Sequence, residues 1–297
     1  MLNLLKIILR FGLSTLNFIY YWFRYIKYSG ISLNLNDSKI LKFYVLKIIH
    51  ALEKSMCFIK QNYKSGFRNF YLLEKIKNRK NLKTFEKNYV KNILLEFDSF
   101  KKNEINNIPN DEFYNFHKSI YFKSYNFKNF FSSRRSCRNF TKKIVSFSTI
   151  KKAVNYAITS PSVCNRRTWK FYVYQNKKKI NQILELQNGN KGFTETIYNL
   201  GIITVDLKAF ASGNEVYQSW IEGGIFSSTL VYAFHSLGVA NCCLNWSQSA
   251  SNDIKLRQIT NINKSENIIM LLAFGYSDNY PVCKSLVEST ENFIIRE

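Results

Sequence analysis

The stretch "TSPSVCNRRTWKFYVYQ", residues 159–175, places a polar loop directly before an aromatic strand. Pro161 ends the preceding helix, because proline has no N–H to donate and disfavours a helical conformation in the residue before it. Ser162 and Asn165 are short polar residues that suit a hydrogen-bonded loop. Trp169 then begins a run of aromatic and β-branched residues, which is typical of a strand. The stretch therefore predicts a helix, a polar loop and a strand in immediate succession.

The alternation of helix and strand continues from this stretch to the C-terminal end. The first predicted element is a helix over 147–159, capped by Ser148 and with Ile150, Val154 and Ala157 on one face. A strand over 169–175 and a short helix over 177–187 follow. The last three elements are a strand over 201–207 that is buried on both faces, a helix over 222–238 that ends at Gly238, and a buried strand over 267–276. Such an order predicts an α+β fold or an α/β sandwich around a sheet.

The N-terminal part of the chain has a different sequence pattern. Apolar residues recur at spacings of three and four over 38–56 and again over 78–100, as one buried helix face requires. Residues 123–131 lack clear periodicity, and we expect a loop there. We therefore divide the chain into a basic, mainly helical extension over residues 1–131 and a sandwich domain over residues 132–297.

The net positive charge of the chain favours anionic partners but does not identify one. The chain of 297 residues has a formal net charge of +23, and residues 1–131 hold 23 Lys and Arg against 9 Asp and Glu. A basic surface favours acidic lipid, polyanionic polysaccharide, nucleic acid or a phosphorylated cofactor. No helix-turn-helix, zinc-finger or RNA-binding signature is present, which argues against nucleic acid.

The cysteines argue against a structural metal site. Six cysteines without a Cys-x-x-Cys pair, together with three histidines, do not form a zinc-binding pattern. No cleavable signal peptide is convincing, so we expect reduced thiols in a cytoplasmic protein.

The first 28 residues are strongly apolar but are interrupted by four basic residues, Lys6, Arg10, Arg24 and Lys27. Only 13 residues separate Arg10 from Arg24, too few for a helix to span a bilayer. Two interpretations remain open: a basic amphipathic helix in peripheral contact with a membrane surface, or a helix packed on the protein's own core or on a partner subunit.

A second polar stretch, "SSRRSCRNF" over 132–140, carries Arg134, Arg135 and Arg138 within five positions. Arginine binds phosphate oxygens bidentately and stays charged at all relevant pH values, and Ser136 adds a hydroxyl donor. Alone, the run also fits a solvated basic segment, because 43 of the 297 residues are Lys or Arg.

Taken together, the two stretches resemble the nitroreductase family of FMN enzymes, which pairs an "RRSxRxF" element with "APSxxNxQPWxF". The matching residues here are Arg134, Arg135, Ser136, Arg138 and Phe140 in the first element, and Pro161, Ser162, Asn165, Trp169 and Phe171 in the second. The segments over 220–246 and 271–285 look like the family's later elements, in the family's order. Upstream, "LEKSM" and "GFRNFYLLEKI" resemble a long-N-terminal subgroup associated with polysaccharide gene clusters.

The resemblance implies an α+β fold in which the α/β sandwich has a central mixed, mostly antiparallel sheet. It also implies a homodimer with two FMN sites at the subunit interface, and it assigns roles to residues. Arg134, Ser136 and Arg138, with Arg135 alongside, would bind the phosphate end of FMN. The other subunit would contribute Pro161, Ser162, Val163 and Asn165. Either Gly223 or Gly224 would let a backbone N–H approach flavin N5, and Lys284 would close the phosphate side.

The chain departs from the family pattern where Gln-Pro is replaced by Arg167-Thr168. An arginine near the N1–C2 carbonyl edge of the flavin would favour the anionic reduced form. Glu222 is either an acid near the ring or a residue that complements the helix dipole, and we favour the second. We expect Cys137 and Cys164 to be small buried fillers and His235 to be a packed core residue.

The predicted function is an FMN-dependent oxidoreductase that passes electrons from NAD(P)H through flavin N5 to a small, electron-poor acceptor. No side chain is assigned as a catalytic acid or base. Two alternatives stay open: a flavoenzyme acting as reductase or dehydrogenase on a sugar or lipid-linked intermediate of surface polysaccharide synthesis, and a flavin-free interaction module of that pathway.

Overall fold

One of the two inner strands of the sheet is β2 (Leu200–Asp206), and all of its residues are buried. The computed structural model describes residues 2–56, 66–102, 127–278 and 289–296. The sheet has the order β1-β2-β4-β3, with β1 at Trp169–Tyr174, β4 at Glu266–Gly275 and β3 at Ala240–Asn245. The two inner strands are covered on both faces, which explains their nearly continuous apolar sequences.

The four named strands pair antiparallel throughout. The parallel contribution to the sheet is an isolated bridge between Ser136 and Asn241. The register between β2 and β4 shifts after Ile203, which leaves Ile269 as the extra residue of a β-bulge.

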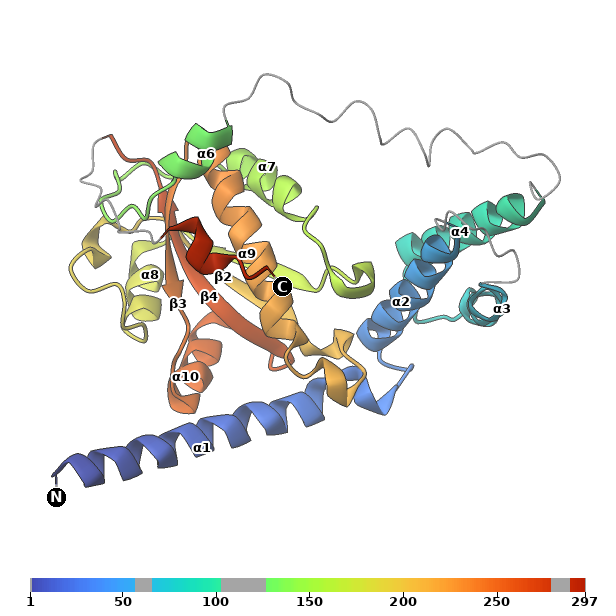
Figure 1. Ribbon diagram of the computed structural model, residues 1–297, viewed down its shortest axis with the longest axis horizontal. Coiled ribbons are helices and arrows are strands. Elements are labelled where there is room, and N and C mark those ends of the chain that lie inside the picture. Colours follow the sequence, from blue (N-terminus) through green and yellow to red (C-terminus); the bar gives the residue numbers. More distant parts are fainter. Residues whose placement is uncertain (1, 57–65, 103–126, 279–288, 297) are drawn as a thin grey trace.

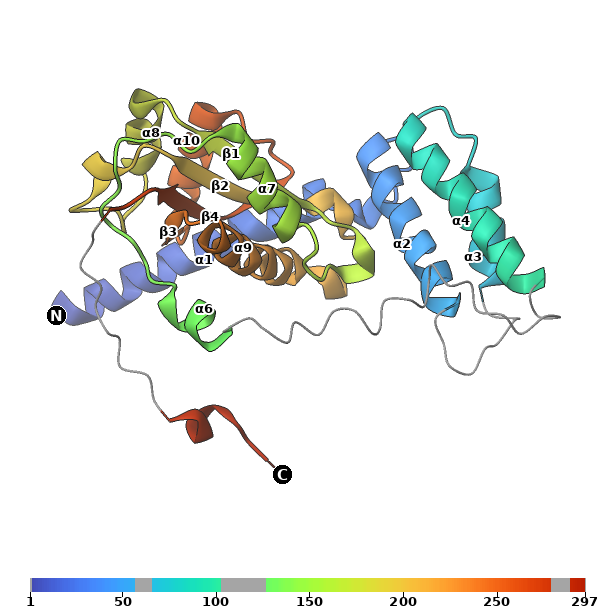
Figure 2. The ribbon, with the colours of Figure 1, turned by 90° about the horizontal axis from the view of Figure 1, so that it is seen from above.

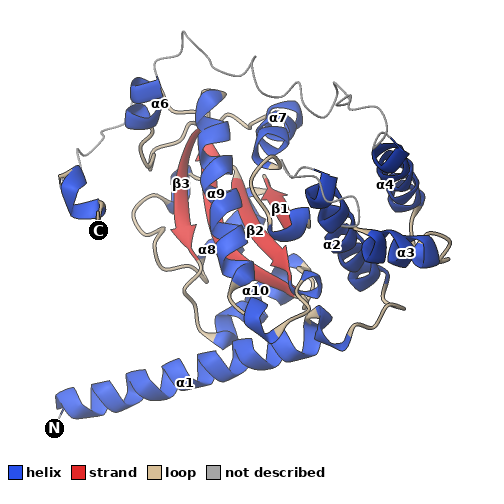
Figure 3. Ribbon diagram, turned by 45° about the vertical axis from the view of Figure 1, so that its right-hand side comes forward, coloured by secondary structure: helices blue, strands red, loops and turns tan. Residues whose placement is uncertain are grey.

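Helices cover both faces of this sheet (Figures 1 and 3). On one face lie α7 (Phe147–Ala157) and α9 (Gln218–Ser236), and on the other α8 (Lys177–Leu184) and α10 (Ala250–Thr260). The period of two along β2 separates the two cores, because Ile203 packs in the cluster with α9 whereas Ile202 packs in the cluster with α8. The α+β sandwich is therefore confirmed.

The helix ends follow from local chemistry. α7 begins after Ser146, whose side-chain oxygen accepts a hydrogen bond from the Thr149 N–H at 3.2 Å. The predicted cap Ser148 is wrong, because it lies inside the first turn. The predicted end of the next long helix is confirmed: Gly238 takes φ +69°, the left-handed conformation that closes α9. That helix begins four residues earlier than expected, at Gln218.

A separate helical unit precedes the sandwich (Figure 2). It consists of α2 (Ser38–Met56), α3 (Phe67–Ile76) and α4 (Thr84–Lys102). These helices share an apolar core of their own that includes Leu41, Ile49, Leu52, Leu73, Val90, Ile93 and Phe97. The short 3-10 helices among the described residues are Gly30–Ser32, Val163–Asn165, Thr194–Thr196, Leu207–Ala209, Gly213–Glu215 and Thr290–Phe293.

Part of the loop predicted over 123–131 is helical. Residues 123–126 lie outside the described residues, and α6 occupies Phe127–Ser133. The rings of Phe130 and Phe131 pack against Tyr232 of α9, with centroid distances of 5.8 and 5.0 Å. This contact is tertiary, so periodicity within the segment did not reveal it.

The first helix, α1 (Leu2–Tyr28), packs on the sandwich although it precedes α2 in the chain. Tyr20 donates to an Asp253 carboxylate oxygen at 2.6 Å, and Arg24 donates to the Asn267 amide oxygen at 2.7 Å. The division at residue 131 therefore describes chain order, whereas in space α1 belongs with the sandwich. None of the helices in the described ranges has the length and hydropathy that a bilayer span requires.

Candidate functional site

The arginine-rich stretch forms an extended segment beside the edge strand β3. The N–H of Cys137 donates to the carbonyl of Asn241 at 3.0 Å, which fixes the segment against the start of that strand. Arg134 and Arg135 are half-buried and Arg138 is exposed. Cys137, between them, is fully buried in the core shared with α8, so its predicted role as a filler is confirmed.

The three arginines have no acidic side chain beside them in the part of the chain that the structure describes. Among the described residues, no Asp or Glu oxygen lies within 4.0 Å of Arg134, Arg135 or Arg138. Two of these charges act on one buried thiol: burial raises the pKa of Cys242, and the positive charges of Arg138 and Arg134 oppose that rise. The side chains thus concentrate positive charge, with no carboxylate partner in the described ranges, at one edge of the sheet, which suits a bound anion.

The second predicted element, the loop over 162–168, is organised by the buried carboxylate of Glu222 in α9. This carboxylate accepts hydrogen bonds from the Val163 N–H at 2.8 Å, the Thr168 hydroxyl at 3.1 Å and the Ser162 hydroxyl at 3.4 Å. Burial raises the pKa of Glu222, and the hydrogen bonds from the loop oppose that rise. The dipole role expected for Glu222 is wrong: the residue lies past the first turn of α9, and its carboxylate holds the loop.

The backbone of this loop is strained. Cys164, Asn165 and Arg167 have φ values of +50°, +51° and +48°, in the left-handed region. Such a conformation costs roughly 1–2 kcal/mol for a residue with a side chain, and strained residues of this kind cluster at ligand clamps and active sites. Cys164 is also partly exposed, which contradicts its predicted role as a buried filler.

Local hydrogen bonds keep Arg167 in this conformation. Its N–H donates to the Ser162 hydroxyl oxygen and its Nε donates to the Asn165 amide oxygen, each at 2.9 Å. The side chain of Arg167 is exposed, as is Pro161, while Val163 is half-buried. The loop therefore presents one cation to the surface on a fixed backbone.

The neighbouring arginine, Arg166, points inward and was not predicted. Its side chain is 1% exposed and forms an ion pair with Glu215, and it also donates to the carbonyls of Ala209 and Val163. Burial alone would raise the pKa of Glu215, but the hydrogen bonds from Arg166 and the Ala211 N–H hold it below its ordinary value. No sequence signal distinguishes Arg166 from Arg167, because tertiary contacts alone decide which one is buried.

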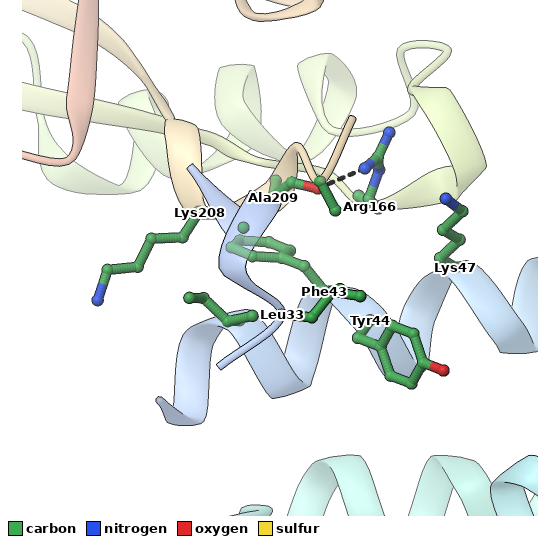
Figure 4. A pocket seen from close by; sticks show the side chains of 10 residues that line it. Leu33, Phe43, Tyr44, Lys47, Arg166, Lys208 and Ala209 are labelled. Carbon is green, nitrogen blue, oxygen red and sulfur yellow. Dashed lines mark hydrogen bonds between the residues drawn. The ribbon is translucent and has the colours of Figure 1, made fainter. Parts of the chain in front are cut away.

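The helical extension reaches this loop through α2. Phe43 of α2 packs in the same apolar cluster as Val163 and Phe210. A cavity of 140 Å³ lies at this junction, and Phe43, Tyr44, Lys47, Arg166 and Ala209 are among its lining residues (Figure 4). Since α2 contacts the loop directly, the extension is part of the loop's surroundings.

Ion pairs reinforce the junction between α2 and the sandwich. Lys39 pairs with the buried Asp206 at 2.9 Å, and Lys208 pairs with Asp37 just before α2. Each side thus contributes one cation and one carboxylate, which fixes the direction of α2 on the domain.

The two glycines of α9 differ in their surroundings. A Cβ added to Gly223 would lie 2.4 Å from Ile269, the bulged residue of β4, whereas a Cβ on Gly224 would meet no atom of the described residues within 4 Å. Both lie past the first turn of α9, where each N–H is bonded within the helix. Gly223 permits close packing of α9 on the sheet, and among the described residues Gly224 has open space beside it. The approach of either N–H to flavin N5 stays a prediction.

One chain does not bring the two loops together. Glu222 holds the 162–168 loop near the start of α9, while His235 at its other end contacts the Ser133 hydroxyl at 2.9 Å, one residue before Arg134. His235 lies thirteen positions after Glu222 along α9, a rise of about 20 Å at 1.5 Å per residue. His235 is only half-buried, so its predicted place in the core is wrong. Lys284, the remaining predicted site residue, lies outside the described residues.

Comparison with known proteins adds a family match to this geometry. A family model described as the Nitroreductase family matches residues 131–191, which contain both candidate loops. No curated protein matches the chain significantly.

Several solved structures are similar in fold. A nitroreductase family protein from Streptococcus pneumoniae is 17% identical, with a TM-score of 0.50, over 58% of this chain and 100% of that one. An FMN-dependent nitroreductase from Clostridium difficile is 21% identical, with a TM-score of 0.46, over 53% of this chain and 91% of that one. A nitroreductase with bound FMN from Desulfitobacterium hafniense is 16% identical, with a TM-score of 0.44, over 57% of this chain and 97% of that one. The similarity to the Streptococcus pneumoniae protein shows that the sandwich has a nitroreductase-like fold.

Proposed function

We propose that the protein is an FMN-dependent oxidoreductase of nitroreductase type, which passes electrons from NAD(P)H to a small electron-poor acceptor. The observation that carries this proposal is the set of three arginines beside β3 that lack carboxylate partners among the described residues. The match of residues 131–191 to the Nitroreductase family model supports a flavin phosphate as the anion they bind.

The side chains present fit this cofactor. Arg134, Ser136 and Arg138, with Arg135 alongside, would hold the phosphate end through charge-assisted hydrogen bonds. Bound FMN would supply hydride transfer at its N5 atom. Lys284 stays a proposed further contact of the phosphate.

A second copy of the chain would complete the site. The arginine segment and the 162–168 loop lie about 20 Å apart along α9, so we infer that the loop serves the partner's flavin. α9 and its N-cap residue also expose a stripe at helical spacing, formed by Tyr217, Ile221, Gly224, Ile225 and Ser228. Its small residues would allow a second α9 to approach closely. These features support a homodimer with two flavin sites at the subunit interface.

The loop's own residues act by position and charge. Pro161, Ser162, Val163 and Asn165 would form a rigid edge against the flavin ring, with the backbone held by Glu222. Arg167 would place a cation where negative charge accumulates on reduction, which stabilises that charge. No side chain of the described loops has the exposure and hydrogen-bonding pattern of a general acid, so we assign positioning and electrostatics to the protein.

The test is the cofactor content of the purified protein. We expect a yellow protein whose flavin is released on denaturation. The double variant R134A/R138A should bind FMN at least about 100-fold more weakly, because each charged hydrogen bond contributes about 1.5–3 kcal/mol. R68A, which removes an exposed arginine of α3, is the matched control and should bind FMN normally. A colourless protein that takes up no added FMN would support the flavin-free interaction module instead.

One observation favours a more specific acceptor. The exposed apolar side chains of α1 would suit an enzyme that works beside lipid, where lipid-linked intermediates of surface polysaccharide synthesis are found. Steady-state turnover with NADH or NADPH and a water-soluble quinone or nitroaromatic separates the two cases. Rapid turnover would favour a general nitroreductase activity, and flavin reduction without turnover would favour a lipid- or sugar-linked acceptor.

A further inference from the structure

The helix α1 exposes an unusual amount of apolar surface. Ten of its large apolar side chains are between 40% and 71% exposed: Ile8, Leu9, Phe11, Leu13, Leu16, Phe18, Ile19, Trp22, Phe23 and Ile26. Single exposed apolar residues are normal on a soluble protein, but a continuous row of them marks an interaction surface.

Most of these side chains, with the exception of Leu9 and Leu13, lie away from the face of α1 that holds the sandwich. Tyr20 and Arg24 hydrogen-bond to the sandwich, and Tyr21 packs edge-on against the ring of Trp220. At 100° per residue, Ile8 and Ile26 lie on the opposite side of the helix from these contacts. The apolar row from Ile8 to Ile26 is about 27 Å long at 1.5 Å per residue.

The charge of α1 suits an anionic surface. The helix contains four basic residues and neither Asp nor Glu. Arg24 is buried, with its guanidinium donating to Asn267 and to the carbonyls of Lys264 and Glu266. Lys6 and Lys27 remain exposed near the two ends of the apolar row. The free face is thus apolar along its length and flanked by cations, the pattern of helices that lie in a membrane interface.

The position of α1 allows contact with a plane. Figures 1 and 3 show α1 along the lower edge of the molecule, with the sandwich and α2–α4 on one side of it. A second copy fits this face less well, because two α1 helices without acidic residues would bring like charges together. The stripe on α9 proposed for the homodimer belongs to a different helix, so the two surfaces can be occupied at once.

We infer that α1 lies in the plane of an anionic bilayer and inserts the apolar face around Phe11, Ile19, Trp22, Phe23 and Ile26. Contacts between α1 and the sandwich stay in place, so the whole domain is carried to the membrane. This inference does not depend on the cofactor, because it concerns the surface opposite those contacts.

The test is co-sedimentation of the full-length protein with vesicles. With a mixture of phosphatidylcholine and phosphatidylglycerol of about 3:1, the wild type should pellet, and binding should weaken as salt is raised. The variant I19Q/W22Q/F23Q should partition at least about tenfold more weakly, because three apolar side chains no longer enter the lipid. Pure phosphatidylcholine should recover less protein, since the exposed lysines gain nothing there.

A matched control removes exposed aromatic side chains elsewhere. Phe85 of α4 and Phe147 of α7 are 76% and 78% exposed, so F85Q/F147Q should pellet like the wild type. Circular dichroism and sedimentation velocity verify the fold and the oligomeric state of each variant. Wild-type protein that stays in the supernatant with both lipids would overturn the inference, and so would equal pelleting of I19Q/W22Q/F23Q. If the wild type does not bind vesicles and I19Q/W22Q/F23Q loses self-association, the apolar face of α1 would instead bind a second copy of the chain.

Discussion

The buried carboxylate of Glu222 offers the sharpest test of how α9 controls the 162–168 loop. Substitution E222A removes the acceptor of the Val163 N–H at 2.8 Å and of the Thr168 hydroxyl at 3.1 Å. Hydrogen bonds to a charged group are worth about 1.5–3 kcal/mol each, so the two together contribute about 3–6 kcal/mol. The contact with Ser162 at 3.4 Å is long and adds little.

Burial of the carboxylate offsets part of this sum. Desolvation raises the pKa of Glu222, which means that the charged form is costly in the folded state and that its removal recovers some free energy. We therefore expect E222A to lower the free energy of unfolding by about 3 kcal/mol, near the lower end of that range. The isosteric E222Q keeps an acceptor for Val163, and its amide can donate to the Thr168 hydroxyl oxygen, so it should cost about 1 kcal/mol.

Urea denaturation measures these differences, and hydrogen exchange locates them. The Val163 and Arg167 amides should exchange faster in E222A, because both N–H groups belong to the loop that Glu222 holds. The control E195A removes a carboxylate whose side chain is 86% exposed and should change stability by less than about 0.5 kcal/mol. Equal stability of E222A and wild type, or equal losses in E222A and E222Q, would refute the role assigned to this carboxylate.

Two further predictions concern α9 and the loop. The variant G223A should lower the melting temperature, because the new Cβ lies 2.4 Å from Ile269 and overpacking costs about 1–3 kcal/mol. G224A should raise the melting temperature of the isolated subunit, since alanine favours a helix by about 1 kcal/mol over glycine. The same variant should weaken the dimer, which sedimentation equilibrium measures. A stronger dimer would contradict the proposed interface. The Arg166–Glu215 pair should stabilise the fold above about pH 4.5, because the pKa of Glu215 is lowered in the folded state, and this contribution should vanish as the pH falls through that lowered value. Urea titrations of wild type and E215Q across acidic pH measure it, and E215Q should show a shallower loss of stability; an unchanged slope would contradict the linkage.

Local patterns were enough to place most elements. The strands predicted over 201–207 and 267–276 are β2 and β4, each shifted by one residue, because uninterrupted apolar runs are found where strands are buried on both faces. The helix predicted over 38–56 is α2 without change. The apolar residues of 78–100 predicted a helix that begins later, at Thr84.

Neighbours distant in sequence decided the rest. The segment of α6 is helical where its aromatic rings reach Tyr232, a contact between residues about 100 positions apart. Arg166 and Arg167 are identical in type and adjacent, yet one pairs with Glu215 inside the protein and the other is exposed. Propensity and periodicity act within a few residues and cannot decide such cases.

For this protein, the sequence by itself determined the order of elements, the two polar loops and their resemblance to a flavin-binding family. Those features depend on residue type and short spacing, which a single chain displays directly. The tertiary structure alone decided that Glu222 holds the loop, that α1 packs on the sandwich, and that the two loops lie at opposite ends of α9. Each of these three features depends on which distant residues come into contact when the sheet and its helices pack. Local sequence patterns do not specify such contacts.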